Sequence, residues 1–307
     1  MYYFIVNPNS SSGHGRIIWK HIQAQLQQRH ILYEIYFTKY RHHAAELAAD
    51  ITKKAPNCTL VVIGGDGTVN EVVNGMSNFS TVTFGYIPAG SGNDFARGMR
   101  IPNNPNAAFE LLMHPENITL TDVGVVETKD ARTRFMVSAG LGWDAAICHE
   151  AYCSSLKKML NKIKLGKLIY VGIALRQILL YKASPLTLQL DQQKPISYPR
   201  SYFAAVMNQP YEGGGFLFAP NASSRDRCFH ICLIGDITKK KILMLLPTAY
   251  WGKHVKFKGV HMMSASKIQI NSKYPLPLHF DGEPGGEQEQ AVFSVFPEQL
   301  RVITPQN

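Results

Sequence analysis

Two neighbouring stretches decide the fold of this chain: TLVVIGGDGTVNE at residues 59–71 and VTFGYIPAGSGNDFAR at residues 82–97. Each begins with a run of apolar residues that is typical of a buried strand, and each run breaks abruptly into a glycine-rich turn. Apolar residues then recur at helical spacing after the first turn, at Val69, Val72 and Met76. The sequence therefore predicts two strand–turn–helix units side by side on a parallel sheet.

The paired turns predict a binding site for an anion, because helix N-termini present backbone N–H groups and the positive end of the helix dipole. Asp66 and Asp94, one in each turn, can hold a cation against that anion. Neither GxxxxGK[ST] nor GxGxxG occurs in the chain, which excludes a P-loop and a dinucleotide fingerprint. One Gly-Gly-Asp-Gly alone is as often an ordinary turn, but the two turns together favour a nucleotide-phosphate site with a metal.

Alternating strands and helices extend this first domain on both sides of the two turns. A polar loop, NPNSSSGHG at residues 7–15, follows the first expected strand, at the edge of the sheet where α/β folds bind ligands. The other expected elements are strands at Tyr3–Val6, Leu32–Phe37 and Ile118–Val126 and helices around Ile18–Leu26, Ala44–Ile51 and Ala107–Met113.

From Thr133 onward short strands replace this alternation, which predicts a second domain built as an antiparallel sandwich or a sheet with helices on it. A length of 307 residues with 45% hydrophobic content is enough for two globular domains. We expect a first domain at residues 1–128 and a second at residues 129–296. The strands are expected at 134–138, 186–191, 202–207, 228–234, 267–271, 278–280 and 292–296, and the helices near 143–152, 165–181 and 239–250.

The turns also resemble those of a known family. GGDGTVNE at residues 64–71 is similar to the nucleotide motif of diacylglycerol, sphingosine and NAD kinases and phosphofructokinases, and PAGSGNDFAR at 88–97 resembles the bacterial diacylglycerol kinase-like lipid kinases. Asn7-Pro8, Asp122-Val123-Gly124, Tyr211–Gly215 and Asp281-Gly282-Glu283 fall in the same order as in that family. The resemblance covers nearly the whole chain. It implies a Rossmann-like, NAD kinase/phosphofructokinase-like first domain, to which residues 297–307 return, and a β-rich, sandwich-like second domain.

The resemblance implies that ATP binds to the first domain. For Thr38 two roles stay open together, a nucleotide contact and the N-cap of the following helix. The residues that the family's motifs assign to the nucleotide are Asn7, Pro8, Asn9, Ser10, Ser11, Ser12, Gly13, Thr38, Gly64, Gly65, Asp66, Gly67, Thr68, Val69, Asn70, Glu71, Gly90, Ser91 and Asn93.

Two magnesium sites are expected. Asp122 stands among apolar strand residues and needs a partner, and a Mg²⁺ shared with Asp66 and Asp94 would supply one, because carboxylate oxygens and water suit this ion. In the resembling family an aspartate after Pro-x-Ala holds a structural Mg²⁺, and Asp226 matches it. The family's next residue is glycine, whereas this chain has Arg227, which we expect to resist a positive φ and to weaken that site.

An alcohol acceptor needs a proton acceptor as well as the nucleotide. Asp281 and Glu283 stand at i and i+2, on one side of an extended chain. The resemblance implies that this motif reaches the reaction centre from the second domain. We predict Glu283 as the proton acceptor, with Asp281 assisting or exchanging roles with it. Without the upstream motifs an exposed Asp-Gly turn would be the preferred interpretation.

The formal charge of +10 is concentrated in two stretches without acidic residues, 151–190 and 237–280. Their lysines and arginine alternate with apolar residues, which suits an anionic membrane surface at about 1 kcal/mol per basic residue. Nucleic acid or plain solvent would also accommodate them, but a lipid substrate favours the membrane, and no nucleic-acid partner is expected. The first stretch carries Lys157, Lys158, Lys162, Lys164, Lys167, Arg176 and Lys182.

The remaining features predict a cytoplasmic protein that associates peripherally with the inner face of the membrane. The five cysteines are scattered without a CxxC pair, which indicates a reducing compartment. The N-terminus has no basic leader, and no apolar run approaches the roughly 18 residues of a membrane span. A homodimer stays an open alternative.

Together these features predict an ATP- and Mg²⁺-dependent lipid kinase, with diacylglycerol as the first candidate acceptor and phosphatidic acid as its product. Two alternatives stay open. One is a kinase of a soluble acceptor such as NAD, which would leave PAGSGNDFAR and the basic apolar stretches unexplained. The other is a nucleotide-binding regulator whose basic face binds nucleic acid or membrane. The presence of Asp66, Asp94, Asp281 and Glu283 argues against this alternative.

Overall fold

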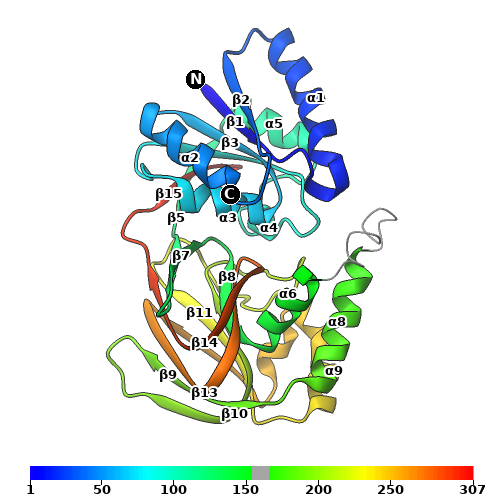
Figure 1. Ribbon diagram of the computed structural model, residues 1–307, viewed down its shortest axis with the longest axis vertical. Helices are drawn as coiled ribbons and strands as arrows, with labels where there is room; N and C mark the ends of the chain where they lie inside the picture. The colour runs from blue at the N-terminus through cyan, green and yellow to red at the C-terminus, as the bar shows by residue number, and fades with distance from the viewer. Residues whose placement is uncertain (154–165, 307) are drawn as a thin grey trace. The chain divides into compact units, whose positions relative to one another are not determined.

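The computed structural model describes residues 1–153 and 166–306, and the chain forms two compact units (Figure 1). The first unit comprises Met1–Val123 and Pro297–Asn307, and the second comprises Gly124–Phe296. The border lies at Val123 rather than at residue 128, because Gly124–Glu127 is already a strand of the second unit's sheet.

The first unit is built on a six-stranded sheet with the order β2-β1-β3-β4-β15-β5. All neighbouring strands are parallel except β5, which runs antiparallel to β15. The predicted parallel sheet is therefore confirmed. Its strands are β1 (Tyr2–Val6), β2 (Tyr33–Phe37), β3 (Thr59–Gly64), β4 (Thr83–Pro88), β5 (Asn117–Thr121) and β15 (Leu300–Thr304).

Five helices accompany this sheet in the described part of the first unit: α1 (His14–Gln28), α2 (His43–Lys54), α3 (Asp66–Gly75), α4 (Asp94–Gly98) and α5 (Pro105–Met113). Apolar residues at helical spacing explain their packing, since Ile18, Ile22 and Leu26 of α1 are all buried. The side chain of Asn104 caps α5 by accepting the N–H groups of Asn106 and Ala107.

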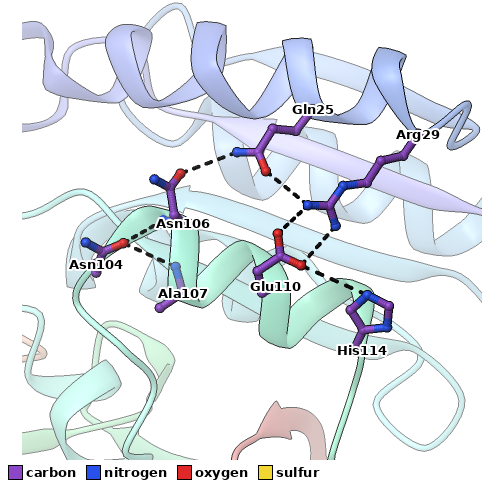
Figure 2. Close-up of polar contacts among 7 residues, drawn as sticks. All are labelled: Gln25, Arg29, Asn104, Asn106, Ala107, Glu110 and His114. Carbon is purple, nitrogen blue, oxygen red and sulfur yellow. Dashed lines mark hydrogen bonds and ion pairs between the residues drawn. The ribbon is translucent and has the colours of Figure 1, made fainter.

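Polar side chains join α1 to α5, as Figure 2 shows. Arg29 of α1 forms a two-pronged ion pair with Glu110 of α5, and Gln25 Nε2 donates to Asn106 Oδ1 at 3.3 Å. Both partners of the ion pair are largely solvent-exposed, so they orient the helices more than they stabilise them.

The predicted strand Ile118–Val126 is wrong as a single element. It consists of β5, which pairs with β15 in the first sheet, and β6 (Gly124–Glu127), which pairs with strands of the second unit. Recurring apolar residues predict strand conformation but do not reveal which partner each half selects.

The second unit contains a nine-stranded antiparallel sheet with the order β12-β11-β10-β8-β13-β14-β6-β7, and β9 pairs with both β10 and β13. Its inner face carries a continuous apolar core that includes Phe135, Leu188, Val206 and Phe293. The other strands are β7 (Arg132–Phe135), β8 (Ser138–Gly142), β9 (Ser184–Leu190), β10 (Ile196–Met207), β11 (Phe229–Gly235), β12 (Val260–Ala265), β13 (Lys267–Phe280) and β14 (Glu283–Val295).

Three described helices belong to this unit, α6 (Trp143–Cys153), α8 (Gly166–Leu180) and α9 (Lys239–Ala249), close to where the sequence predicts them. The prediction missed β12, joined the end of β7 and the start of β8 in one strand at 134–138, and divided β13 into two strands. Within the described residues, no helix has both the length and the apolar character that crossing a membrane would require.

Candidate active site

The two predicted glycine turns lie against each other at the carboxyl ends of β3 and β4. A Cβ atom on Gly90 would lie 2.6 Å from the Cα of Gly65, so the two backbones approach as closely as only glycines permit. The amide of Ala89 donates to the carbonyl of Gly64 at 2.7 Å, and Tyr86 Oη donates to the same carbonyl at 3.1 Å. The turns therefore form one continuous backbone cradle.

Asp66 fastens this cradle to α4. Its Oδ2 accepts the N–H of Asp94 at 3.2 Å, and its Oδ1 accepts the N–H of Phe95 at 3.1 Å. Burial raises the pKa of the Asp66 carboxyl above its usual value, although these N–H groups oppose the shift. Asp66 thus acts first as a clamp between the two turns.

Asn93 closes the second turn on itself. It adopts a left-handed φ of 54°, which asparagine tolerates better than most residues. Its Oδ1 accepts the N–H of Gly90 at 2.9 Å, and its Nδ2 donates to the carbonyl of Gly90 at 3.1 Å. Ser91 lies exposed at the tip of the same turn.

A pocket of about 230 Å³ opens beside α3 in the first unit. Asn7 and Thr68, joined by an Asn7 Nδ2 to Thr68 Oγ1 hydrogen bond of 3.1 Å, form part of its wall. The complete lining is Asn7, Asn9, Thr38, Lys39, Tyr40, Arg41, Thr68 and Glu71. Five of these eight residues were predicted as nucleotide contacts. The sequence analysis missed the other three, KYR at 39–41, although a basic run directly after a strand of the parallel sheet was a usable signal.

The predicted capping role of Thr38 is wrong. Helix α2 begins at His43, and its N-cap is His42 in a left-handed conformation with φ of 66°. An N–H of its first turn, that of Ala44, donates instead to Glu71 Oε2 at 3.2 Å. Thr38 lies in the pocket wall, and its backbone N–H continues the pairing of β2 with β1 by donating to Val6.

The loop after β1 is conformationally strained. Ser11, Ser12 and Gly13 have successive φ values of 44°, 61° and 100°, a left-handed run that serine adopts only at a cost. Ser10 Oγ donates to the carbonyl of Asn7 at 3.0 Å and holds the loop to the strand end. Such strain is common where a backbone is shaped for a ligand.

Several predicted contacts are buried and support the site from behind. Pro8, Ser10, Val69 and Asn70 are all buried, and Val69 is only 1% exposed within the apolar core of the first unit. Their side chains therefore support the loop and the helix, and a direct side-chain contact of Val69 with a nucleotide is excluded by its position.

The predicted Mg²⁺ site of Asp66, Asp94 and Asp122 stays a prediction, and these three carboxylates form no preformed cluster among the described residues. Across residues 1–153 and 166–306, only Asp144, Glu212 and His279 bring the ligand atoms of three such side chains within 4.8 Å of one another. Asp94 is ion-paired with Arg97, and the fully buried Asp122 accepts a 2.8 Å hydrogen bond from Gln299 Nε2. The three carboxylates thus have separate partners, and no preformed three-carboxylate site results among the described residues. The nucleotide-side pair Asp66 and Asp94 suits a Mg²⁺ only if phosphate oxygens complete its coordination.

The predicted structural metal site at Asp226 stays a prediction. Asp226 is exposed, and its Oδ1 accepts the N–H of Cys228 at 3.1 Å within its own turn. Arg227 nevertheless adopts the positive φ, 61°, that we expected it to resist, so the turn persists without the glycine.

The Asp281–Glu283 turn of the second unit is tightly anchored. Asp281 has a left-handed φ of 49°, and its carboxylate accepts N–H groups from Met136 at 2.8 Å, Val137 at 2.8 Å and Ser138 at 3.2 Å. Three N–H donors stabilise the ionised carboxylate and occupy both of its oxygens. Glu283, half-buried at the start of β14, carries the second carboxylate of the motif.

Family comparisons agree with this division of the chain. Residues 1–126 match the model of the diacylglycerol kinase catalytic domain. Residues 139–304, more than half of the chain, match the model of the YegS C-terminal NAD kinase beta sandwich-like domain.

Similarity to relatives and to solved structures extends over nearly the whole chain. The chain is 32% identical over 310 residues to "Putative lipid kinase YtlR" of Bacillus subtilis (strain 168), with 99% of each covered. It is 26% identical over 290 residues to a diacylglycerol kinase of the same organism, covering 92% of this chain and 89% of that one. A crystal structure of a diacylglycerol kinase from Bacillus anthracis str. Sterne superposes with a TM-score of 0.72 at 20% identity, covering 99% of this chain and 96% of the other. An NAD kinase from Archaeoglobus fulgidus superposes with a TM-score of 0.55 at 11% identity, covering 100% of this chain and 94% of the other. The predicted fold and family are thus confirmed, and the chain belongs to the diacylglycerol kinase-like lipid kinases.

Proposed function

We propose that this lipid kinase transfers the γ-phosphoryl group of ATP to a hydroxyl of a membrane lipid, with diacylglycerol as the first candidate. The observation that carries the proposal is the fused Gly65–Gly90 cradle beside a pocket that Lys39 and Arg41 help to line. Relatives from Bacillus subtilis and Mycobacterium tuberculosis named diacylglycerol kinase, at 26% and 27% identity, support the choice of acceptor.

The chemistry asks mainly for positioning and charge neutralisation. In the proposed complex the N-terminus of α3 and the two turns contact the phosphates, since the N-cap residue of this helix, Gly65, has no side chain that could bind its first N–H groups. Lys39 and Arg41 add positive charge at the pocket. A Mg²⁺ bound with the nucleotide would neutralise phosphate charge, and Asp66 and Asp94 are the carboxylates that would hold it.

We further propose that Glu283 accepts the proton of the lipid hydroxyl. Asp281 already accepts three backbone N–H groups, so it is the less available of the two as a base. Its role in this scheme is to anchor the turn and to keep negative charge beside Glu283.

Labelled ATP and a panel of purified lipids test the reaction directly. We expect a labelled phospholipid from diacylglycerol, a large loss of this product in Glu283→Gln, and unchanged ATP binding by calorimetry in the same variant. An equal loss of ATP affinity would contradict the base role, and phosphorylation of NAD in place of every lipid would contradict the acceptor class.

We also propose an anionic membrane surface as the partner of the second unit. Most of the large apolar side chains exposed in the described part of this unit lie on α8, on α9 and in the turn after α9, which adjoin in Figure 1 and are joined by a hydrogen bond from Lys239 Nζ to the Leu179 carbonyl at 2.6 Å. We call these residues the α8–α9 face: Leu175, Leu179, Leu180, Met244, Tyr250, Trp251 and Phe257, with exposed Lys240, Lys253, Lys256 and Lys258.

Apolar side chains among lysines suit the headgroup region of an anionic bilayer. Burial of the apolar groups and attraction of the lysines to anionic headgroups both favour binding there. Of the basic residues predicted for this role, Lys157, Lys158, Lys162 and Lys164 lie outside the described residues, as does the side chain of Lys167. The proposed surface therefore consists of residues of α8 and of the chain that follows it.

A further inference from the structure

The second unit contains a buried charged cluster that the sequence analysis did not anticipate. The side chain of His279 is fully buried, and its Nε2 lies 3.2 Å from Asp144 Oδ2 and 3.4 Å from Glu212 Oε1. Asp144 is 8% exposed and the Glu212 side chain 12%. Buried charges at this depth persist only when they are paired.

Three separate elements supply this cluster. His279 lies near the end of β13, Asp144 in the first turn of α6, and Glu212 in the loop between β10 and β11. The backbone makes room for it, because Gly140 pairs with His279 across the β8–β13 ladder and a Cβ there would lie 2.6 Å from Asp144 Oδ2. The arrangement therefore ties the end of one strand to two distant parts of the chain.

The charges of the cluster are strongly coupled. Burial alone lowers the pKa of His279, but the carboxylates of Glu212, Asp144 and Asp281 outweigh it and raise the pKa to about 9. The imidazole is therefore protonated at neutral pH and faces three carboxylates.

The same strand end leads directly into the Asp281–Glu283 turn. Two residues after His279, Asp281 receives the N–H groups of Met136, Val137 and Ser138. One residue before it, the Leu278 carbonyl lies 2.7 Å from His149 Nε2. The segment 278–281 is thus held by contacts on several sides. Among the contacts named here, those of His279 are the ion pairs made by a side chain of β13 itself.

We propose that His279 is a positioning residue: through its ion pairs with Asp144 and Glu212 it fixes the end of β13 and so orients the Asp281–Glu283 turn. The consequence for catalysis rests on the proposed kinase reaction, whereas the effect on the turn does not. Replacing His279 removes the ion pairs that hold the end of β13 to Asp144 of α6 and to Glu212, and it leaves two buried carboxylates without their cation, so the strand end is no longer fixed.

Hydrogen exchange by mass spectrometry tests the positioning without any assay of activity. In His279→Gln, exchange of the amides of Met136–Ser138 is expected to be about tenfold faster than in the wild type, because the Asp281 carboxylate that binds them is displaced. His254→Gln is the matched control, since His254 is also buried in this unit but bonds the Phe218 carbonyl through its Nε2. Unchanged exchange in His279→Gln, or equal acceleration in the control, would overturn the proposal.

A second variant guards against a failure of His279→Gln to fold. Glu212→Gln removes one charge at the more exposed edge of the cluster and is expected to accelerate the same amides by a smaller factor. Metal analysis of the purified wild type belongs to the same experiment. A stoichiometric divalent ion that is lost in both variants would overturn the ion-pair assignment.

Kinetics then connect the cluster to the reaction. With the lipid acceptor that the labelled-ATP assay identifies, we expect a lower kcat in His279→Gln with an unchanged KM for ATP. An unchanged kcat with accelerated exchange would overturn the catalytic consequence while the positioning stands. A wild type that phosphorylates no lipid would overturn the proposed acceptor class alone, and the exchange experiment would still decide the positioning.

Discussion

At the scale of single residues, the site depends on two glycines without side chains as much as on the side chains around them. Gly65 and Gly90 allow two turns to share one backbone surface, and Asp66 then fixes α4 to that surface. The sequence predicted the pairing of the turns, because strand and glycine patterns are local. It did not predict that Asp66 faces backbone N–H groups, because the partner of a carboxylate is set by tertiary packing.

The first prediction concerns Gly90→Ala. The new methyl group would collide with the Gly65 backbone, which cannot move aside like a flexible side chain, so we expect a loss of about 1–3 kcal/mol in the free energy of unfolding and at least tenfold weaker ATP binding. Denaturant titration and calorimetry measure the two effects.

Gly172→Ala is the matched control, because a Cβ there meets nothing within 4 Å and the residue is exposed in α8. We expect it to stabilise the protein by about 0.5–1 kcal/mol. A Gly90→Ala protein that binds ATP like the control would contradict the fused cradle.

The second prediction follows from the raised pKa of His279. A histidine whose folded pKa is about 9, against an unfolded value of about 6.5, contributes its full stabilisation below pH 6.5 and loses it as pH rises through 9. We therefore expect the stability difference between wild type and His279→Gln to shrink by about 3 kcal/mol between pH 6 and pH 9.5. Urea denaturation across that range measures it, and a constant difference would show that the imidazole is not charged in the folded protein.

At the scale of elements, most strands and helices follow from local pattern, and the failures share one cause. Apolar residues recur along residues 118–126, yet the sheet partner changes at Asp122 and Val123, where the chain passes from one unit to the other. Likewise α2 begins at His43 because Glu71, a residue of α3, receives the N–H of Ala44. Pairing and capping across distant segments are not visible in a local pattern.

The third prediction concerns the α8–α9 face. Trp251→Ser and Met244→Ser remove side chains that are 65% and 75% exposed, so folding stability should change little while binding to anionic vesicles weakens about fivefold for each. Co-sedimentation with vesicles of anionic and of neutral lipids measures the effect.

Leu32→Ser offers a matched control, because Leu32 is 78% exposed but belongs to the first unit. Equal weakening in this control would show that apolar exposure in general, and not the α8–α9 face, drives the association. Vesicle binding that is unchanged at high salt would show that the lysines do not contribute to it.

At the scale of the whole molecule, the chain leaves its first unit at Val123 and returns to it at Pro297. The returning strand β15 lies between β4 and β5, with Leu300 and Val302 fully buried. This return could be expected only from the family resemblance. The composition of residues 300–304 would suit an inner strand of the first unit's sheet and an additional strand of the second unit's sheet equally well.

The fourth prediction is that deleting residues 297–307 abolishes ATP binding, because among the described strands β15 is the only neighbour of β5 and the outer neighbour of β4. Deleting residues 305–307, which follow β15, is the control and should leave binding intact. Calorimetry with ATP and circular dichroism of both proteins make the comparison. ATP binding by the longer deletion would show that β1–β4 suffice for the nucleotide site.

The position of β15 has a consequence for biosynthesis. Strand β15 follows every described strand of the second unit along the chain, so during synthesis the sheet of the first unit stays open at β4 until those strands have emerged. The usual order, in which the N-terminal part matures first, is therefore reversed here. A nascent chain can therefore complete the sheet of the second unit before that of the first, and a chain that stops before Leu300 lacks an inner strand of the first sheet.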